Sequence, residues 1–308
     1  MTKEKLLTLQ KTDVEWCYQH FFGRPPESEE VVEWHLNHSK NLRQLVEVLT
    51  RSREYEYKKY NHAPPLEDQS ELHYFFHIHK TGGMSIHEYL HDAVPAGELL
   101  PGYLKKDILN IGTPNSFRYL SGHFGGVPLM LQGRRLRMAT LLRNPVQRGL
   151  SHYKHARREK ENVILSDGYG DFYKKIHKEI MNSSLEEFLY SPFASMVFGN
   201  HQACQLADLT DSSLLLIKRF SDNGITAEEL YDLAIKGLSK MELVGITEKL
   251  EEFISCLADR WNLPKPVKDY VVNSDPAKER KQLTQNQIKR IRELCAVDIR
   301  IYDHVKHS

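Results

Sequence analysis

Two short polar segments contain residue types that could bind and transfer an anionic group. The first, residues 77–85, reads HIHKTGGMS and follows an apolar stretch. Gly82 and Gly83 would allow backbone N–H groups to approach an anion closely at the start of a helix. The side chains that would add a positive charge or a hydroxyl donor are Lys80, Thr81 and Ser85. The segment is a candidate anion-binding loop, and the alternative is an ordinary tight turn made by two glycines.

The second segment, residues 143–153, reads RNPVQRGLSHY and also follows an apolar stretch. Pro145 suits the first turn of a helix, which places Arg143 at the end of a strand and Ser151 two turns along the helix. The fork of an arginine together with a hydroxyl is a good receptor for a phosphate monoester. The alternative is a surface helix with an arginine near its start.

The order of residues in the first segment separates it from common catalytic motifs. The P-loop of kinases places Lys and Ser or Thr after its last glycine, whereas Lys80 precedes both glycines. No acidic metal ligand follows an evident strand, which further disfavours a kinase. A serine hydrolase is disfavoured because the sequence has no G-x-S-x-G segment. A P-loop-type phosphotransferase and a non-catalytic nucleotide-binding or anion-binding protein stay open as alternatives.

The elements around these segments predict an α/β fold, with a mostly parallel central sheet flanked by helices. The predicted strands are Tyr74–Ile78, Arg118–Leu120, Leu136–Leu142, Leu214–Ile217 and Leu243–Ile246. The capping boxes that predict helix starts are Ser184–Glu187, Thr226–Glu229 and Thr284–Gln287. Ligands of such sheets bind where the carboxyl ends of strands lead into helices, and both polar segments are at such positions.

The chain divides by composition into three parts. Residues 1–62 have apolar residues at helical spacing, which predicts a small all-helical accessory module. Residues 63–70 include adjacent prolines and predict a linker to a domain that spans residues 71–308. The stretch around the Gly-Arg-Pro-Pro turn at residues 23–26 resembles a helical module of unknown function that occurs beside bacterial enzymes. That resemblance implies no chemistry.

Composition argues against several classes of protein. The 308 residues carry a formal net charge of +1, and no apolar run approaches the ~20 residues of a membrane span. The four cysteines are too far apart in the sequence to suggest a zinc site or a disulfide framework. The N-terminal residues lack the apolar core of a secretion signal, so a cytoplasmic protein is expected.

One segment is locally basic. Between Arg134 and Lys160 the only acidic residue is Glu159, whereas Lys and Arg are frequent. Such a segment suits an anionic partner such as a glycan, and the alternative is a solvated helix face. Its bases do not alternate with aromatic residues as in a groove for single-stranded nucleic acid, so no nucleic-acid partner is expected.

The two polar segments, residues 77–85 followed by residues 143–153, resemble the sulfotransferase family that uses 3′-phosphoadenosine 5′-phosphosulfate. The resemblance is to the branch that acts on carbohydrate hydroxyls, such as the heparan and uronyl 2-O-sulfotransferases. It covers residues 71–308 and includes four shorter pieces, which are Ser121–Phe124, Gly199–Gln202, ELVGITEKLEEF and DIRIYD. It implies a P-loop-like nucleotide-binding fold, 3′-phosphoadenosine 5′-phosphosulfate as co-substrate, and 3′,5′-adenosine bisphosphate as product.

The resemblance also implies roles for individual residues. The loop that holds the 5′-phosphosulfate matches Lys80, Thr81, Gly82, Gly83, Met84 and Ser85. Lys80 would lie near the bridging oxygen of the donor. Arg143 and Ser151 match the pair that binds the 3′-phosphate. His123 matches the general base, so Lys80 and His123 are the expected catalytic residues.

Three positions depart from the family pattern. His79 stands where proline is usual, and Met84 stands where threonine is usual, so one hydroxyl donor to the 5′ side is absent. The segment Asn200–Gln202 reads Asn-His-Gln in place of Asn-Arg-Gln, which puts a role for an arginine there in doubt. Among the 16 histidines, His79 is also the competing candidate for the base because it adjoins Lys80.

The implied reaction is an in-line attack of an acceptor hydroxyl, preferably on a saccharide or glycan, opposite the departing phosphate. No carboxylate cluster for magnesium is evident, so no metal is expected. The segment Asn273–Arg280 is a candidate loop over the adenine, and the alternative for it is a solvated turn.

Overall fold

The computed structural model describes residues 9–22, 24–50, 52, 55, 71–95, 97–100, 117–123, 135–158, 171–210, 225–270 and 283–307. The chain divides into one unit of residues 1–67 with 106–117 and a second unit of residues 68–105 with 118–308. The predicted linker 63–70, strand Leu214–Ile217 and loop Asn273–Arg280 lie outside the described residues. The predicted domain boundaries stay predictions.

The first unit contains the three helices that the apolar spacing predicts. These are α1 (Lys11–Phe22), α2 (Glu29–His38) and α3 (Leu42–Thr50). Their shared core consists of Leu9, Val14, Cys17, Tyr18, Phe22, Val32, Leu45 and Leu49. The Ser28 hydroxyl accepts a hydrogen bond from the Val31 N–H and so caps the start of α2.

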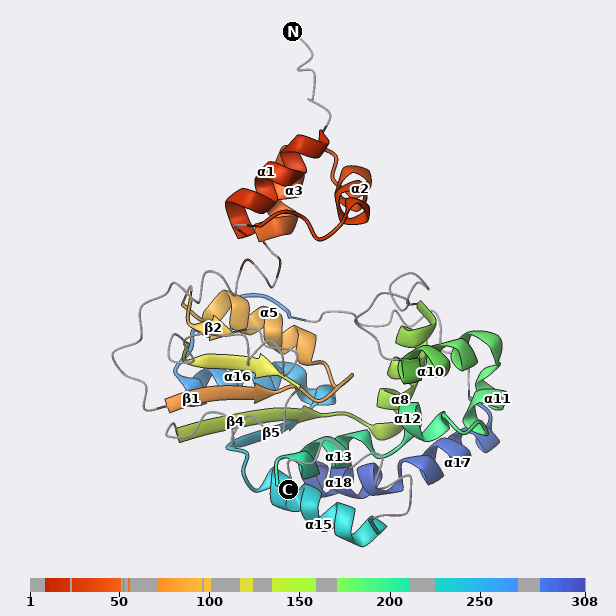
Figure 1. Ribbon diagram of the computed structural model, residues 1–308. Helices are drawn as coiled ribbons and strands as arrows, with labels where there is room; N and C mark the ends of the chain where they lie inside the picture. The colour runs from red at the N-terminus through yellow and green to blue at the C-terminus, as the bar shows by residue number, and fades with distance from the viewer. Residues whose placement is uncertain are drawn as a thin grey trace. The chain divides into compact units, whose positions relative to one another are not determined.

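The second unit contains a five-stranded sheet in the order β2-β3-β1-β4-β5, with every neighbouring pair parallel (Figure 1). Its strands are β1 (Glu71–Phe76), β2 (Leu99–Leu100), β3 (Tyr119–Gly122), β4 (Arg135–Leu142) and β5 (Leu243–Ile246). The predicted α/β class with a parallel sheet is confirmed. The predicted first strand began and ended too late, because His77 and Ile78 already belong to the loop. The sequence did not predict β2, which is only two residues long.

The strand order sets where a ligand can bind. From β1 the chain continues to β2 on one side of the sheet, and from β4 it continues to β5 on the other side. The neighbours β1 and β4 are therefore the point at which the connections diverge. In open parallel sheets, ligands bind beyond the carboxyl ends of the strands at this point. The two polar segments follow β1 and β4.

Helices α5 (Gly83–Ala93) and α16 (Leu250–Trp261) pack on one face of the sheet. Phe75 of β1 and Leu141 of β4 share this core with Ile86, Leu90, Phe253 and Leu257 of the two helices. A short 3₁₀ helix, η1 (Thr247–Lys249), connects β5 to α16. The group α13 (His201–Asp208), α15 (Ala227–Leu238) and α18 (Ala296–His307) packs together, and α18 contacts β5.

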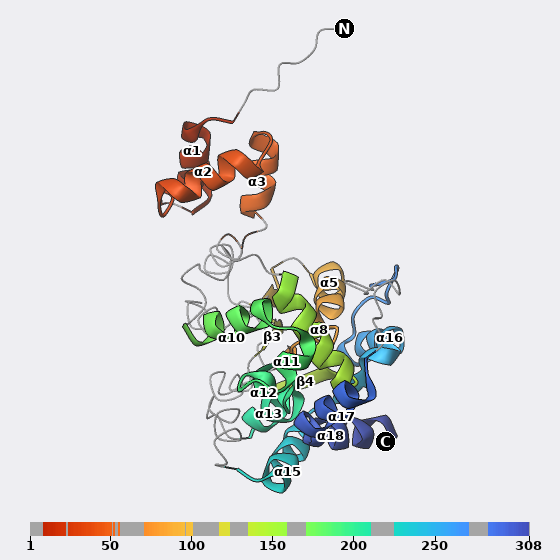
Figure 2. The same cartoon turned by 90° about the vertical axis from the view of Figure 1, so that its right-hand side faces the viewer.

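A second helical group extends from the carboxyl edge of the sheet (Figures 1 and 2). It consists of α8 (Pro145–Arg158), α10 (Asp171–Asn182), α11 (Leu185–Leu189), α12 (Ala194–Phe198) and α17 (Gln285–Leu294). Gly149 is required on α8 because an added Cβ would come within 2.5 Å of the Phe198 ring on α12. All three predicted capping boxes are present, at the starts of α11, α15 and α17. Within the described ranges, no helix is both long and apolar enough to cross a membrane.

Part of the locally basic segment has structural partners. Arg137 donates to both carboxylate oxygens of Glu242, at 2.5 and 2.8 Å. Arg148 is fully buried and donates to the Val197 carbonyl at 2.5 Å. The interpretation of this segment as a surface for an anion is therefore wrong for these two arginines. The Arg137 guanidinium is paired with the Glu242 carboxylate, and the Arg148 guanidinium is buried against the Val197 carbonyl. Arg134 and Lys160 lie outside the described residues.

The close contact of β5 with α16 predicts the effect of one substitution. In Gly245→Ala the added Cβ would lie 2.3 Å from Cδ2 of Phe253. We expect a loss of about 1–3 kcal/mol in the free energy of unfolding, because overpacking shifts a buried ring. Chemical denaturation measures it, and exposed Cys256→Ala on the same helix is the control, with an expected change within about 0.5 kcal/mol. Equal stability of Gly245→Ala and wild type would contradict this packing.

Candidate active site

The loop after β1 is a tight turn whose conformation is fixed by its own backbone. Lys80 and Gly82 both adopt the left-handed conformation, with φ of 67° and 89°. The buried Thr81 hydroxyl donates to the Ile78 carbonyl at 2.9 Å, so it is used inside the loop. Helix α5 then begins at Gly83 without a side-chain cap. Its first N–H groups and the positive end of its dipole therefore lie at the carboxyl edge of the sheet, where they suit an anion.

Gly83 has a structural role that the sequence did not predict. An added Cβ at this position would lie 1.9 Å from Cδ2 of His77. The ring of His77 thus occupies the space that any side chain at position 83 would need. Gly83 allows the helix start to lie directly against a buried histidine.

Thr247 joins the loop after β1 to the end of β4. Its hydroxyl lies 2.5 Å from the Thr81 carbonyl and 3.0 Å from the Leu142 carbonyl, and it can donate to either. Its methyl group would lie 3.2 Å from a Cβ at Gly82. Thr247 is the first residue after β5, so three neighbouring strand ends meet at one hydroxyl.

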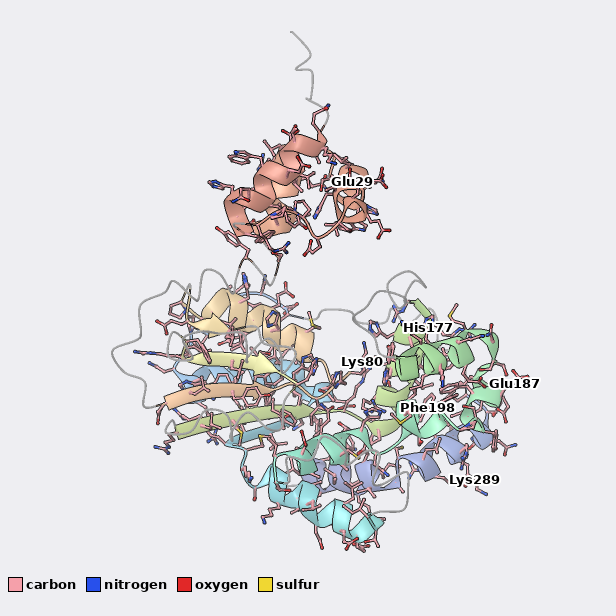
Figure 3. The ribbon with its side chains drawn as sticks, in the orientation of Figure 1. Glu29, Lys80, His177, Glu187, Phe198 and Lys289 are labelled. Atoms are coloured by element: carbon pink, nitrogen blue, oxygen red, sulfur yellow. The ribbon has the colours of Figure 1, made fainter. Side chains whose placement is uncertain are left out.

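Arg143 and Lys80 lie together. Nη1 of Arg143 donates to the Lys80 carbonyl oxygen at 3.3 Å, so the loops after β4 and β1 are in direct contact. Figure 3 shows Lys80 at the carboxyl edge of the sheet, on the side of α8 and α10. The Arg143 guanidinium and Lys80, which come from separate sequence motifs, are therefore close to the uncapped start of α5. Such a group of charges and N–H donors can hold a molecule that carries more than one anionic group.

The backbone of Arg143 is held by Gln202, the second residue of α13. The Gln202 amide accepts from the Arg143 N–H at 2.9 Å and donates to the Arg143 carbonyl at 2.9 Å. The Gln202 N–H in turn donates to the Asp298 carboxylate at 3.1 Å. Gln202 and Asp298 are fully buried, whereas Arg143 is half-buried.

Asp298 and Asn200 cap each other's helices. Asp298 of α18 accepts from the first turn of α13 through the N–H groups of Gln202 and Ala203, at 3.1 and 2.7 Å. Asn200, which precedes α13, accepts from the N–H groups of Val297 and Asp298 at 2.9 and 3.1 Å. Burial raises the pKa of Asp298 to about 6, although nearby Arg148 and the two N–H donors favour its ionised form.

His123 follows β3 and lies within a cluster of histidines. Its Nδ1 donates to the His77 carbonyl at 2.5 Å, and its ring stacks on His79 with centroids 3.8 Å apart and planes 11° apart. The centroid of His77 is 4.4 Å away. Because the Nδ1 proton is used on the carbonyl, the neutral ring has its lone pair on Nε2. In this tautomer Nε2 can accept a proton.

His79, the competing candidate, has a fixed orientation as well. Gln205 of α13 accepts from the His79 backbone N–H at 3.1 Å and lies 3.3 Å from its Nδ1. His79 therefore contacts both His123 and Gln205 of α13. His79, which stands where the resembled family has proline, thus directly contacts His123, the expected base.

The structure places the other predicted residues as follows. Ser85 is buried in the first turn of α5, and its N–H donates to the Gly82 carbonyl at 3.0 Å. Met84 is 44% exposed, and its side chain adds no donor to the loop. Ser151 is half-buried on the second turn of α8, the helix that starts two residues after Arg143. The expected roles of these residues stay predictions.

Four residues of the site were missed as functional candidates: Gln202, Gln205, Thr247 and Asp298. Gln202, Thr247 and Asp298 are within segments that carried the resemblance, but only their partners far along the chain reveal what they do. No group of three or more His, Cys, Asp or Glu side chains in the described part of the chain could hold a metal ion. The expectation of a metal-free site stays a prediction.

The buried histidines predict a loss of stability in acid. Burial lowers the pKa of His201 to about 3 and the pKa of His77 well below its ordinary value. The unfolded chain takes up these protons below pH ~6.5 and the folded chain does not, so stability falls as pH falls, by about 1.4 kcal/mol per unit for each ring. In His201→Gln we expect one proton fewer to be taken up on unfolding. Denaturation curves between pH ~7 and ~5 measure it, and an unchanged slope would contradict a neutral buried His201.

Comparison with curated proteins identified heparan-sulfate 6-O-sulfotransferases as relatives. Heparan-sulfate 6-O-sulfotransferase 1 of Homo sapiens is 26% identical over 216 residues, which cover 67% of this chain and 47% of the relative. The protein of the same name from Gallus gallus is 26% identical over 181 residues, which cover 56% of this chain and 43% of the relative. The chain thus spans about half the length of the curated relatives that it matches. No family model matches the chain.

The relatives agree with the family that the two motifs resemble. Their names specify 6-O-sulfotransferases, whereas the resemblance drawn from the motifs was to 2-O-sulfotransferases. The parallel sheet, with its polar loops after β1 and β4, is consistent with the fold implied by that resemblance. The chain is therefore similar in sequence to carbohydrate sulfotransferases.

Proposed function

We propose that the protein transfers a sulfuryl group from 3′-phosphoadenosine 5′-phosphosulfate to a hydroxyl group of a saccharide. The observation that carries this proposal is the contact of Arg143 with the Lys80 carbonyl at the point where the strand connections diverge. It brings both predicted anion-binding motifs to one place. The sequence similarity to heparan-sulfate 6-O-sulfotransferases supports the reaction class.

The residues present fit the two anionic ends of this donor. The uncapped start of α5 and the Lys80 amine suit the 5′-phosphosulfate, since they supply N–H donors and a positive charge. The Arg143 guanidinium suits the 3′-phosphate as a planar donor group. Ser151 is proposed as a hydroxyl donor to the same phosphate.

The reaction requires three actions from the chain. His123, with its Nδ1 proton held by the His77 carbonyl, accepts the proton of the acceptor hydroxyl at Nε2. The acceptor oxygen forms a bond to sulfur while the bond from sulfur to the phosphate oxygen breaks. Lys80 and the N–H groups of α5 stabilise the negative charge that develops on the departing phosphate. Holding donor and acceptor in line lowers the entropic part of the barrier.

The acceptor is proposed by analogy with the relatives. Their names specify heparan sulfate, a glycan, as the molecule on which they act. A glycan acceptor is consistent with the basic residues of α8 that are exposed, Arg157 and Arg158. The cytoplasmic location expected from the sequence stays a prediction.

Nucleotide binding separates this proposal from a kinase. At about 100 times its dissociation constant, 3′,5′-adenosine bisphosphate should stabilise the folded protein by roughly 2.7 kcal/mol. Thermal unfolding measures this, with 5′-AMP and ATP plus magnesium as the comparisons. We expect a smaller shift with both, because neither has a 3′-phosphate for Arg143. A larger shift with ATP plus magnesium would overturn the donor assignment.

The role of His123 predicts a selective loss of catalysis. In His123→Ala we expect the rate of ³⁵S transfer from the labelled donor to 6-O-desulfated heparin to fall by about 10²–10⁴-fold. The affinity for 3′,5′-adenosine bisphosphate should stay within about 2-fold, since His123 faces the acceptor. His304→Ala, an exposed histidine on α18, is the matched control.

Two outcomes would count against these roles. If His123→Ala transfers sulfate as fast as wild type, His123 is not the base, and His79→Ala then tests the neighbouring ring. If wild type binds 3′,5′-adenosine bisphosphate but no saccharide accepts sulfate, the proposal of catalysis fails and the non-catalytic alternative is favoured.

A further inference from the structure

We infer that Gln202 is a positioning residue for Arg143, and that α18 takes part in donor binding because Asp298 holds Gln202. This inference rests on the proposed function, since it concerns how the site would grip the 3′-phosphate of the donor. It assigns a role to two segments that the proposed reaction does not use directly, GNHQ at residues 199–202 and DIRIYD at residues 298–303.

The Gln202 side chain pairs with the backbone of Arg143 as a second strand would. Oε1 accepts from the Arg143 N–H at 2.9 Å, and Nε2 donates to the Arg143 carbonyl at 2.9 Å. These bonds occupy both polar backbone groups of the residue that directly follows β4. An amide offers both a donor and an acceptor at one end, whereas an ionised glutamate of similar size offers acceptors alone. Gln202 therefore makes both bonds without a change in protonation.

The other end of Arg143 is also held. Its Nη1 donates to the Lys80 carbonyl at 3.3 Å, so the guanidinium lies against the loop after β1. Gln202 fixes the backbone from which this long side chain extends. A shift of the backbone would move the guanidinium away from Lys80 and from a phosphate between them, because hydrogen bonds weaken steeply with poor geometry.

Gln202 itself is immobilised by the reciprocal caps of α13 and α18. The Asp298 carboxylate accepts from the Gln202 and Ala203 N–H groups, while Asn200 accepts from the Val297 and Asp298 N–H groups. Gln202 and Asp298 are fully buried. Four hydrogen bonds at low dielectric thus join two helix starts to each other, and one of those starts presents Gln202 to Arg143.

The test compares two nucleotides in one variant. Gln202→Met removes both bonds to Arg143 while it keeps size and charge. We expect the dissociation constant of 3′,5′-adenosine bisphosphate to rise about 10-fold, as for the loss of one to two hydrogen bonds. The affinity for 5′-AMP, which lacks the 3′-phosphate, should change by less than about 2-fold. In turnover, KM for the donor should rise while kcat changes little.

A matched control separates positioning from stability. Gln287 also accepts a backbone N–H with its side chain, from Thr284 at the start of α17. Gln287→Met should lose a similar cap and leave both affinities at the wild-type value. In an Arg143→Met background, Gln202→Met should weaken binding of the bisphosphate no further, since there is no guanidinium left to position.

A measurement on the wild type covers the case in which Gln202→Met does not fold. We expect 3′,5′-adenosine bisphosphate to slow amide hydrogen exchange at Arg143, Gln202 and Ala203, and 5′-AMP to slow it less. Protection of Arg143 alone would overturn the inference. Asp298→Asn, which keeps one acceptor oxygen, should weaken binding of the bisphosphate in the same direction.

The outcomes distinguish the inference from the proposed function. If wild type binds the bisphosphate and Gln202→Met binds both nucleotides as wild type does, the inference is wrong and the proposed function stands. An equal loss for both nucleotides would also overturn it, because Gln202 would then be merely structural. If wild type does not bind the bisphosphate, the proposed function fails and the inference fails with it.

Discussion

The direct contact between the loops after β1 and β4 is the constraint on which the rest of the site depends. Arg143 reaches the Lys80 carbonyl, and the Thr247 hydroxyl lies between the Thr81 and Leu142 carbonyls, so three strand ends are joined. The two left-handed residues of the first loop direct the chain into α5 without a side-chain cap. A parallel sheet places such loops at one edge, and the divergence of connections at β1 and β4 keeps the space above them for a ligand.

Three histidines, His77, His79 and His123, lie beside this contact, and His77 among them is buried. The ring of His77 fills the space beside Gly83, its carbonyl orients His123, and His79 covers the face of His123. Burial lowers the pKa of His77 well below its ordinary value, so this ring adds no positive charge beside Lys80 and Arg143 near neutral pH. A neutral buried ring excludes water without adding charge, which strengthens electrostatic interactions with an anionic ligand. Because the buried rings of His77 and His201 oppose protonation, they make the folded state less stable relative to the unfolded chain as pH falls.

The sequence predicted those features that depend on neighbours in the chain. Apolar runs predicted four of the strands approximately, Pro145 predicted the start of α8, and three capping boxes predicted helix starts. The expected parallel sheet placed the two polar segments at one edge, but the hydrogen bonds between individual distant residues were not predicted. The side chain of Gln202 reaches Arg143, 59 residues away, and its N–H is held by Asp298, 96 residues away. Gly83 was assigned to anion binding or to a tight turn, because no local pattern shows that His77 lies against it.

A crystal structure with 3′,5′-adenosine bisphosphate tests the central claim most directly, because the claim is that one nucleotide is held by both strand ends. The account predicts the 5′-phosphate at the N–H groups of Gly83 and Met84 beside Lys80, and the 3′-phosphate on the guanidinium of Arg143. Nε2 of His123 should then face the open side of the 5′-phosphate. A nucleotide bound elsewhere, or one whose 3′-phosphate does not contact Arg143, would contradict the account.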